Sequence, residues 1–242
     1  MSYLEQPAAP ALRRWIECVW SIETDEAVPA HPVRPDGCID ILYSPAGLHV
    51  VGAMTVERRF PVAARSRTVG LRFRPGMAAA LLRVPAAELT DRIAPLEAFW
   101  NRAARELAER LAESASVEAC RNLLGTALRP PDGPPNGVQR AIEAVTASKG
   151  DTDLERIARQ AGMSERQFRR RCQHESGLAP KQLCRVLRFR HAFALGSRGL
   201  PWGLIAAEAG YFDQAHLIRD FREFTGATPM SVFSNTNDAR LG

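Results

Sequence analysis

Lysine is nearly absent from the sequence, and the features that mark membrane and exported proteins are absent too. Only two of the 32 basic residues are lysines, Lys149 and Lys181. No run of 18 or more apolar residues occurs, and the N-terminal stretch MSYLEQPAAPALRRW lacks the charged and then apolar regions of a signal peptide. We therefore expect a soluble, cytoplasmic protein without membrane contact.

Patterns of catalytic and metal-binding residues are also missing. The five cysteines are odd in number and form no C-x-x-C pair, so we expect reduced, mostly buried thiols rather than disulfides or a zinc site. The five histidines occur in no G-x-S-x-G or H-E-x-x-H setting. His31, Cys38 and Asp40 are residue types that can hold a metal, but their spacing matches no tight site. We expect no enzyme, no cofactor and no metal.

The positive charge is confined to the C-terminal part of the chain. Residues 1–136 hold 16 Arg and 16 acidic residues, whereas residues 137–242 hold 16 basic and 11 acidic residues, a net charge of +5. Within this part, residues 153–190 contain ten basic and four acidic residues. This excess favours a polyanionic partner.

Composition also divides the chain into an α+β arrangement. Short β-branched runs such as CIDILYS, LHVVGA, RRFPVA and RTVGLRF predict antiparallel strands, and apolar spacing predicts helices over 96–111 and 117–128. The segment RPPDGPPNG cannot continue a helix. We expect a β-rich domain that ends in helices at 1–128, a Pro/Gly-rich linker at 129–137, an all-helical domain at 138–235 and a tail at 236–242.

The helical domain contains an internal repeat. IARQAGM (157–163) matches IAAEAGY (205–211) at an offset of 48, and after one inserted residue ESGLAP (175–180) matches FTGATP (224–229) at an offset of 49. Each copy has small residues on a first helix, a glycine that ends it and a capping residue, Ser164 or Asp213, that starts a second helix. The pattern predicts two helix-turn-helix units, joined by a linker helix over 181–196.

The second helix of each unit is predicted to read DNA. An arginine-rich helix alone is most often a solvated face, but these arginines follow a helix-turn-helix turn, where exposed residues meet base edges. Phe168 and Cys172 are predicted to face inward, with Leu217 and Phe221 in the second copy; Arg171 points elsewhere by helical phase. The predicted DNA-binding residues are Arg166, Arg169, Arg170, Gln214, His216 and Arg219. A rigid linker helix would place the two helices in successive major grooves.

These residues carry a family resemblance. LERIARQAGMSERQFRRRCQHESGLAPKQLCRVLRFRHAFAL and the more diagnostic IAAEAGYFDQAHLIRDFREFTGATP resemble the DNA-binding domain of AraC/XylS-type regulators, over about 40% of the chain. The resemblance implies a bacterial-type transcriptional regulator that reads base pairs with the six residues above. Cys172 departs from the phenylalanine that is usual at its position.

The N-terminal part resembles the poorly characterised domain that accompanies such regulators in some bacteria, and this resemblance supplies no ligand. Its RPDGC segment predicts a structural turn. The sharper hypothesis is an effector pocket whose mixed charges orient a polar small molecule. The residues that would form it are Asp36, Asp40, Arg72 and Arg74.

The interpretation is therefore a sequence-specific transcriptional regulator, with two alternatives. One is a repair or alkylation-sensing regulator with a reactive cysteine, which the acidic Asp40 beside Cys38 disfavours. The other is a non-specific architectural DNA-binding protein. The expected partners are double-stranded DNA, RNA polymerase, a small-molecule effector and a second copy of the chain, because helices 96–111 and 117–128 could close a homodimer.

Overall fold

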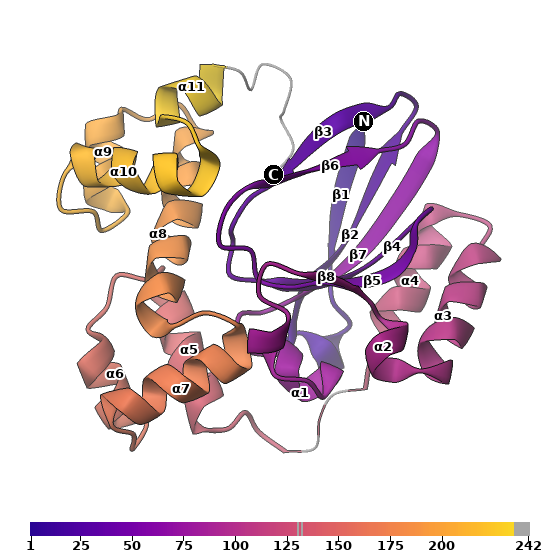
Figure 1. The fold of residues 1–242 in the computed structure, drawn as a ribbon, viewed down its shortest axis with the longest axis horizontal. Coiled ribbons are helices and arrows are strands. Elements are labelled where there is room, and N and C mark those ends of the chain that lie inside the picture. The colour runs from indigo at the N-terminus through magenta and orange to yellow at the C-terminus, as the bar shows by residue number, and fades with distance from the viewer. Residues whose placement is uncertain (130, 132, 235–242) are drawn as a thin grey trace.

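The N-terminal part is built on an antiparallel sheet. The computed structural model describes residues 1–129, 131 and 133–234. Six strands pair in the order β1-β2-β7-β4-β5-β8, and β3 pairs separately with β6 (Figure 1). The strands are β1 Ser2–Pro7, β2 Ile16–Thr24, β3 Val28–Val33, β4 Ile39–Ser44, β5 Gly47–Val51, β6 Arg58–Val62, β7 Ser66–Phe73 and β8 Ile93–Pro95.

Short helices complete this part. They are η1 Pro10–Leu12, α1 Ala78–Leu82, η2 Ala86–Glu88, α2 Glu97–Trp100, α3 Arg102–Ala112 and α4 Val117–Thr126. Two of them, α3 and α4, pack on strands of the sheet. The helix expected over 96–111 is divided, because Asn101 adopts φ 47° and ψ −125° between α2 and α3. The α4 helix packs on β2 and β7, where the buried Arg121 donates a 2.8 Å hydrogen bond to the Ser21 hydroxyl.

One glycine explains the close packing of two neighbouring strands. Gly70 of β7 is paired with Trp20 of β2, and a Cβ atom at Gly70 would lie 2.1 Å from the indole ring. Any other residue would have to displace the ring. Trp20 is thereby buried with Cys18 and Ile22 in a small cluster on this sheet face.

The described residues of the C-terminal part form helices and no strands, as predicted. Its helices are α5 Gly137–Ala147, α6 Leu154–Gln160, α7 Glu165–Ser176, α8 Pro180–Gly196, α9 Trp202–Glu208, α10 Gln214–Thr225 and α11 Pro229–Ser234. Residues 130 and 132 of the predicted linker lie outside the described residues, as do residue 235 and the predicted tail 236–242. The Asn136 side chain caps α5.

The two parts share one hydrophobic core. The α7 helix packs on α1 and η2, and the Thr90 hydroxyl donates a 2.8 Å hydrogen bond to the carbonyl of Gly177, the C-cap of α7. Gly37 lies against Leu183 of α8. A single cluster of buried apolar side chains runs from the sheet through α8 to α10. The N-terminal part is therefore packed firmly on the helical part.

Candidate nucleic-acid interface

The first helix-turn-helix unit is formed by α6 and α7. Gly162, at φ 68°, ends α6, and Ser164 begins α7 with a capping box that involves Gln167. Phe168 and Cys172 are 2% and 0% exposed and fix the inner face of α7. The Cys172 thiol lies 3.5 Å from the Leu178 carbonyl. Close packing therefore accommodates cysteine at this position, although it is smaller than the phenylalanine that is usual there.

The outer face of α7 presents the predicted arginines to solvent. Arg166, Arg169 and Arg170 are all exposed. Among the described residues, no acidic side chain forms a salt bridge with them. Their guanidinium groups therefore keep all their donors available, which suits bidentate bonds to guanine.

The second unit is formed by α9 and α10. Asp213 caps α10 by accepting a 2.6 Å hydrogen bond from the His216 backbone N–H. Leu217 and Phe221 are fully buried, as the sequence predicted. Gln214 and Arg219 are exposed, whereas the His216 ring is partly covered by Tyr211, at 5.1 Å between ring centroids.

One residue near the start of α10 narrows its exposed face. Ile218 is partly buried and packs against the main core. Helical phase explains this position, because Ile218 follows the inward-facing Leu217 directly. The exposed face of α10 is consequently narrower than that of α7.

Both recognition helices present their N-terminal ends away from the N-terminal part. Gly177, which ends α7, packs on Ala86 and Thr90, and the Phe224 carbonyl near the end of α10 accepts a 2.6 Å hydrogen bond from the Glu57 N–H. In Figure 1 the sheet lies on one side of α8, with α6 and α9 on the other. Among the described residues, the N-terminal part therefore does not cover the base-reading ends of α7 and α10.

The linker helix holds the second unit through an ion-paired arginine. Arg185 of α8 lies 2.7 Å from a carboxylate oxygen of Asp220, which is 2% exposed, and it also pairs with Glu223. The 17 residues of α8 span about 25 Å at 1.5 Å per residue. This helix is thus a rigid spacer between the two units.

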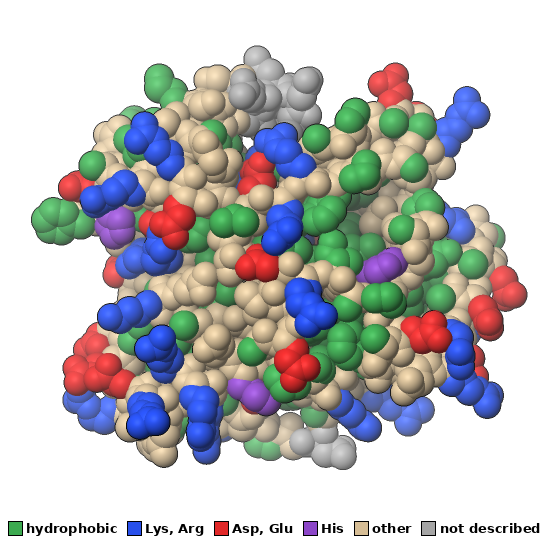
Figure 2. Space-filling view, in the orientation of Figure 1, with side chains coloured by type: hydrophobic (Ala, Val, Ile, Leu, Met, Phe, Trp, Pro, Cys, Tyr) green, Lys and Arg blue, Asp and Glu red, His purple; other side chains and the backbone are tan. Residues whose placement is uncertain are grey.

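The distribution of basic residues partly corrects the sequence analysis. Lys and Arg side chains follow the left-hand edge of Figure 2, over the helices of the C-terminal part. Two of the ten basic residues counted in 153–190 do not belong to this surface, however. Arg185 pairs within the helical domain, and Arg190 pairs with Glu17 of the sheet. Fewer cations than expected are available to a polyanion.

Comparison with known proteins agrees with this geometry. Residues 157–235 match the family described as "Helix-turn-helix domain". The chain carries an AraC-type helix-turn-helix domain. Residues 4–95 match the family described as "Domain of unknown function (DUF6597)". The predicted resemblance is confirmed, and the chain is a DNA-binding transcriptional regulator with a second domain in front.

Solved structures give weaker likenesses. A DNA-binding transcriptional dual regulator from Escherichia coli K-12 is 22% identical, with a TM-score of 0.38 over 46% of this chain and 100% of its own. ToxT from Vibrio cholerae O395 is 9% identical, with a TM-score of 0.45 over 91% of this chain and 97% of its own. At TM-scores below 0.5 these likenesses carry no argument. No curated protein matches the chain.

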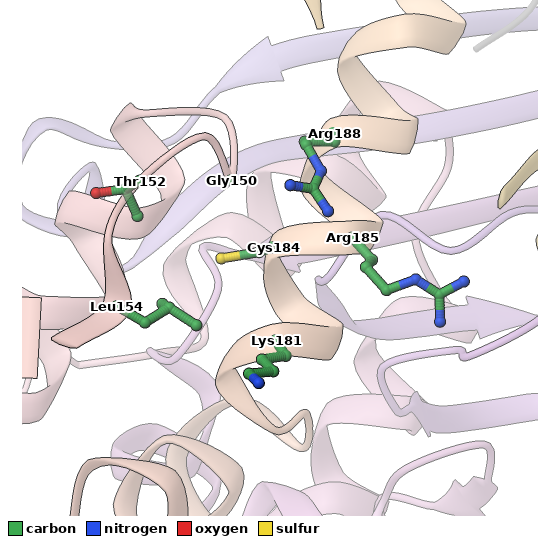
Figure 3. A pocket seen from close by; sticks show the side chains of 7 residues that line it. All are labelled: Gly150, Thr152, Leu154, Lys181, Cys184, Arg185 and Arg188. Carbon is green, nitrogen blue, oxygen red and sulfur yellow. The ribbon is translucent and has the colours of Figure 1, made fainter. Parts of the chain in front are cut away.

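A pocket of about 240 Å³ lies between α8 and the segment that leads into α6 (Figure 3). Gly150, Thr152 and Leu154 line it from the segment before and into α6, and α8 supplies the rest. The lining residues from α8 are Lys181, Cys184, Arg185 and Arg188. In Figure 3 the Arg185 side chain turns away from the α6 side. Lys181 and Arg188 therefore provide the cationic wall of this pocket, on its α8 side.

Three of the four predicted effector residues come together. Arg72 lies 3.2 Å from Asp40 and 3.6 Å from Asp36. Burial raises the pKa of Asp40 to about 6, although the Arg72 charge opposes this shift. Arg74 lies apart and donates a hydrogen bond to the Arg13 carbonyl. Asp36, Asp40 and Arg72 therefore form a cluster of two carboxylates around one guanidinium, here named the Arg72 cluster.

The Arg72 cluster adjoins a contact that the sequence did not predict. Arg190 of α8 donates hydrogen bonds to Glu17 of β2, and its guanidinium lies 3.7 Å from the Cys38 sulfur. The Cys38 backbone N–H donates to Asp36. Burial, and then the Asp36 charge, raise the pKa of the Cys38 thiol. This environment disfavours a reactive thiolate at Cys38.

The described residues contain neither a membrane-spanning helix nor a metal cluster. No helix within the ranges given above has the length and hydropathy needed to cross a bilayer. In the same part of the chain, no three His, Cys, Asp or Glu side chains converge as metal ligands. All five cysteines are buried and free.

Proposed function

We propose that the protein is a sequence-specific regulator whose two recognition helices read successive major grooves on one face of a DNA duplex. The observation that carries this proposal is the shared direction of α7 and α10. Both helices pack their C-terminal ends on the N-terminal domain and leave their N-terminal ends exposed. Recognition helices contact base edges with these N-terminal residues.

The exposed side chains favour two different half-sites. Arg166, Arg169 and Arg170 on α7 suit guanine, which accepts two hydrogen bonds from one guanidinium. On α10, Gln214 suits adenine, and His216 and Arg219 are the other two residues proposed to read bases. A non-palindromic site read by one chain follows from this difference.

The cationic wall of the pocket in Figure 3 would meet the DNA backbone. Lys181 and Arg188 lie on α8, the helix that joins the two units, so a duplex that meets both recognition helices would pass near them. Phosphate contacts fix the register of a protein on DNA without reading the sequence. We therefore assign these two residues to positioning rather than to base recognition.

The N-terminal domain is the proposed sensor of a small molecule. The Arg72 cluster supports this role because it lies beside the Glu17–Arg190 contact that joins the sheet to the linker helix. A polar ligand that pairs with the charged side chains of the Arg72 cluster would weaken or strengthen the neighbouring Glu17–Arg190 contact and so change how α8 is bound to the sheet. The alternative role of the N-terminal domain is dimerisation. For the DNA-bound protein as a whole, RNA polymerase in the cytoplasm is the proposed partner.

Selection of bound duplexes from a random pool tests the proposal. The full chain is incubated with the pool at 150 mM salt and an excess of bulk competitor DNA, and the enriched sequences are then footprinted. We expect one site with two dissimilar halves about one helical turn apart. Recovery of random sequences, with uniform protection along the duplex, would instead support an architectural role.

A further inference from the structure

The turns of the two helix-turn-helix units differ by one residue. Met163 and Tyr211 occupy equivalent positions, because their N–H groups donate to the carbonyls of Ala158 and Ala206 at 3.0 and 2.9 Å. The helix caps that follow are Ser164 in the first unit and Asp213 in the second. Phe212 is therefore an additional residue, inserted between the turn and the recognition helix.

This inserted residue is almost completely exposed. Phe212 is 93% exposed, whereas its neighbour Tyr211 is 5% exposed. An apolar residue just before a helix cap usually packs on the fourth residue of that helix. In the second unit that partner, Leu217, is already fully buried, and Phe212 does not cover it. The Phe212 ring thus contributes nothing visible to the packing of its own unit.

The position of the exposed Phe212 ring indicates a contact with DNA. Single exposed apolar side chains are common on protein surfaces. Phe212, however, directly precedes Asp213 and the exposed Gln214 at the base-reading end of α10. The C5-methyl group of thymine is the apolar group that a base pair offers in the major groove, and phenylalanine is one of the residues that contact it.

We propose that Phe212 contacts a thymine methyl group in the half-site read by α10. This inference rests on the proposed function, because it requires that α10 enters a major groove. It makes Phe212 a specificity-determining residue without any hydrogen bond to DNA. The second half-site then carries a thymine beside the base pair read by Gln214.

Removal of single methyl groups from the DNA tests this contact. Duplexes selected by the full-length protein are prepared with each thymine of the second half-site replaced by deoxyuridine, one position at a time. The half-site is assigned by the base preference that Arg219→Ala relaxes. Affinities are measured for the wild-type protein, for Phe212→Ala, and for Met230→Ala, which removes another exposed apolar side chain, 67% exposed on α11.

We expect one substitution by deoxyuridine to weaken wild-type binding about fourfold, the factor that corresponds to one methyl-sized apolar group. Phe212→Ala should bind the thymine duplex more weakly and should not distinguish it from the deoxyuridine duplex, whereas Met230→Ala should behave as the wild type does. Wild-type indifference to every deoxyuridine in this half-site would overturn the inference, whatever the stability of the variant. Discrimination retained by Phe212→Ala would also overturn it. Failure to select any sequence contradicts the proposed function instead.

Discussion

Arg190 of the linker helix donates hydrogen bonds to Glu17 of the sheet, across 173 residues of sequence. The contact joins α8, which spaces the recognition helices, to strand β2 of the sheet. The two side chains are 36% and 26% exposed, so solvent screens part of their interaction. It is a direct ion pair between the sheet and α8.

Glu17→Gln and Arg190→Met should each destabilise the folded protein by about 1–2 kcal/mol, less than for a fully buried pair. Burial would raise the pKa of Glu17, but the hydrogen bond and charge of Arg190 prevail and lower it. The stabilisation is therefore complete above the unfolded-state pKa and is lost as pH falls through the folded-state pKa. Urea unfolding of the wild type and the variants between pH 3 and 7 measures this loss of stability. A double-mutant cycle that shows no coupling between Glu17 and Arg190 would contradict the prediction.

Base recognition should divide between the two units. We expect Arg169→Ala and Arg219→Ala each to relax base preference in a different half of one site, at a cost of about 1–3 kcal/mol against the preferred base. Binding to a panel of single-base variants of the selected duplex measures this. Arg102→Ala, which removes an exposed arginine from α3, is the control for net charge. Equal weakening on all duplexes would identify the two arginines as phosphate contacts.

The predictable features of the fold are those with a local signal. The two helix-turn-helix units share a sequence signal because each turn has a glycine with a positive φ, Gly162 or Gly210. Short β-branched runs separated by turn residues mark the strands β4 to β7. The strand β2 was missed because its residues are buried on both faces, so no alternation marks it. The Glu17–Arg190 contact has no local signal at all, because it depends on how the two domains pack.

The buried Asp220 should make Arg185 important for stability. We expect Arg185→Ala to destabilise the protein by about 2–4 kcal/mol, because it leaves a carboxylate that is 2% exposed without its cation. Glu223→Gln is the matched control, since Glu223 is 57% exposed and should contribute about 0–1 kcal/mol. Chemical denaturation measures both. Equal losses from the two variants would show that burial of Asp220 is not the source of the effect.

The C-terminal fragment should be weakened by loss of the N-terminal domain. The Pro-rich linker predicts that fragment 138–235 folds alone and binds the same sequence as the full chain. Separation of this fragment from the N-terminal domain, however, exposes Ile142, which packs on Gly76, and Leu183, which packs on Gly37. We expect the same base preference, with a melting temperature lower by about 10 °C or more and affinity reduced about tenfold. Unchanged stability and affinity would mean that the domain contact plays no part in ordering the recognition helices.

The role of the N-terminal domain can be decided with the full chain. A sensor must bind its ligand with different affinity in the DNA-competent and DNA-incompetent states, since equal affinity shifts no population. A metabolite screen should therefore yield a polar compound that raises the melting temperature and changes operator affinity, with both effects lost in Asp36→Asn. That substitution removes a charge of the Arg72 cluster and leaves Asp40 to pair with Arg72. A broad screen without a stabilising compound, together with a stable dimer in sedimentation experiments, would instead identify the domain as a dimerisation module.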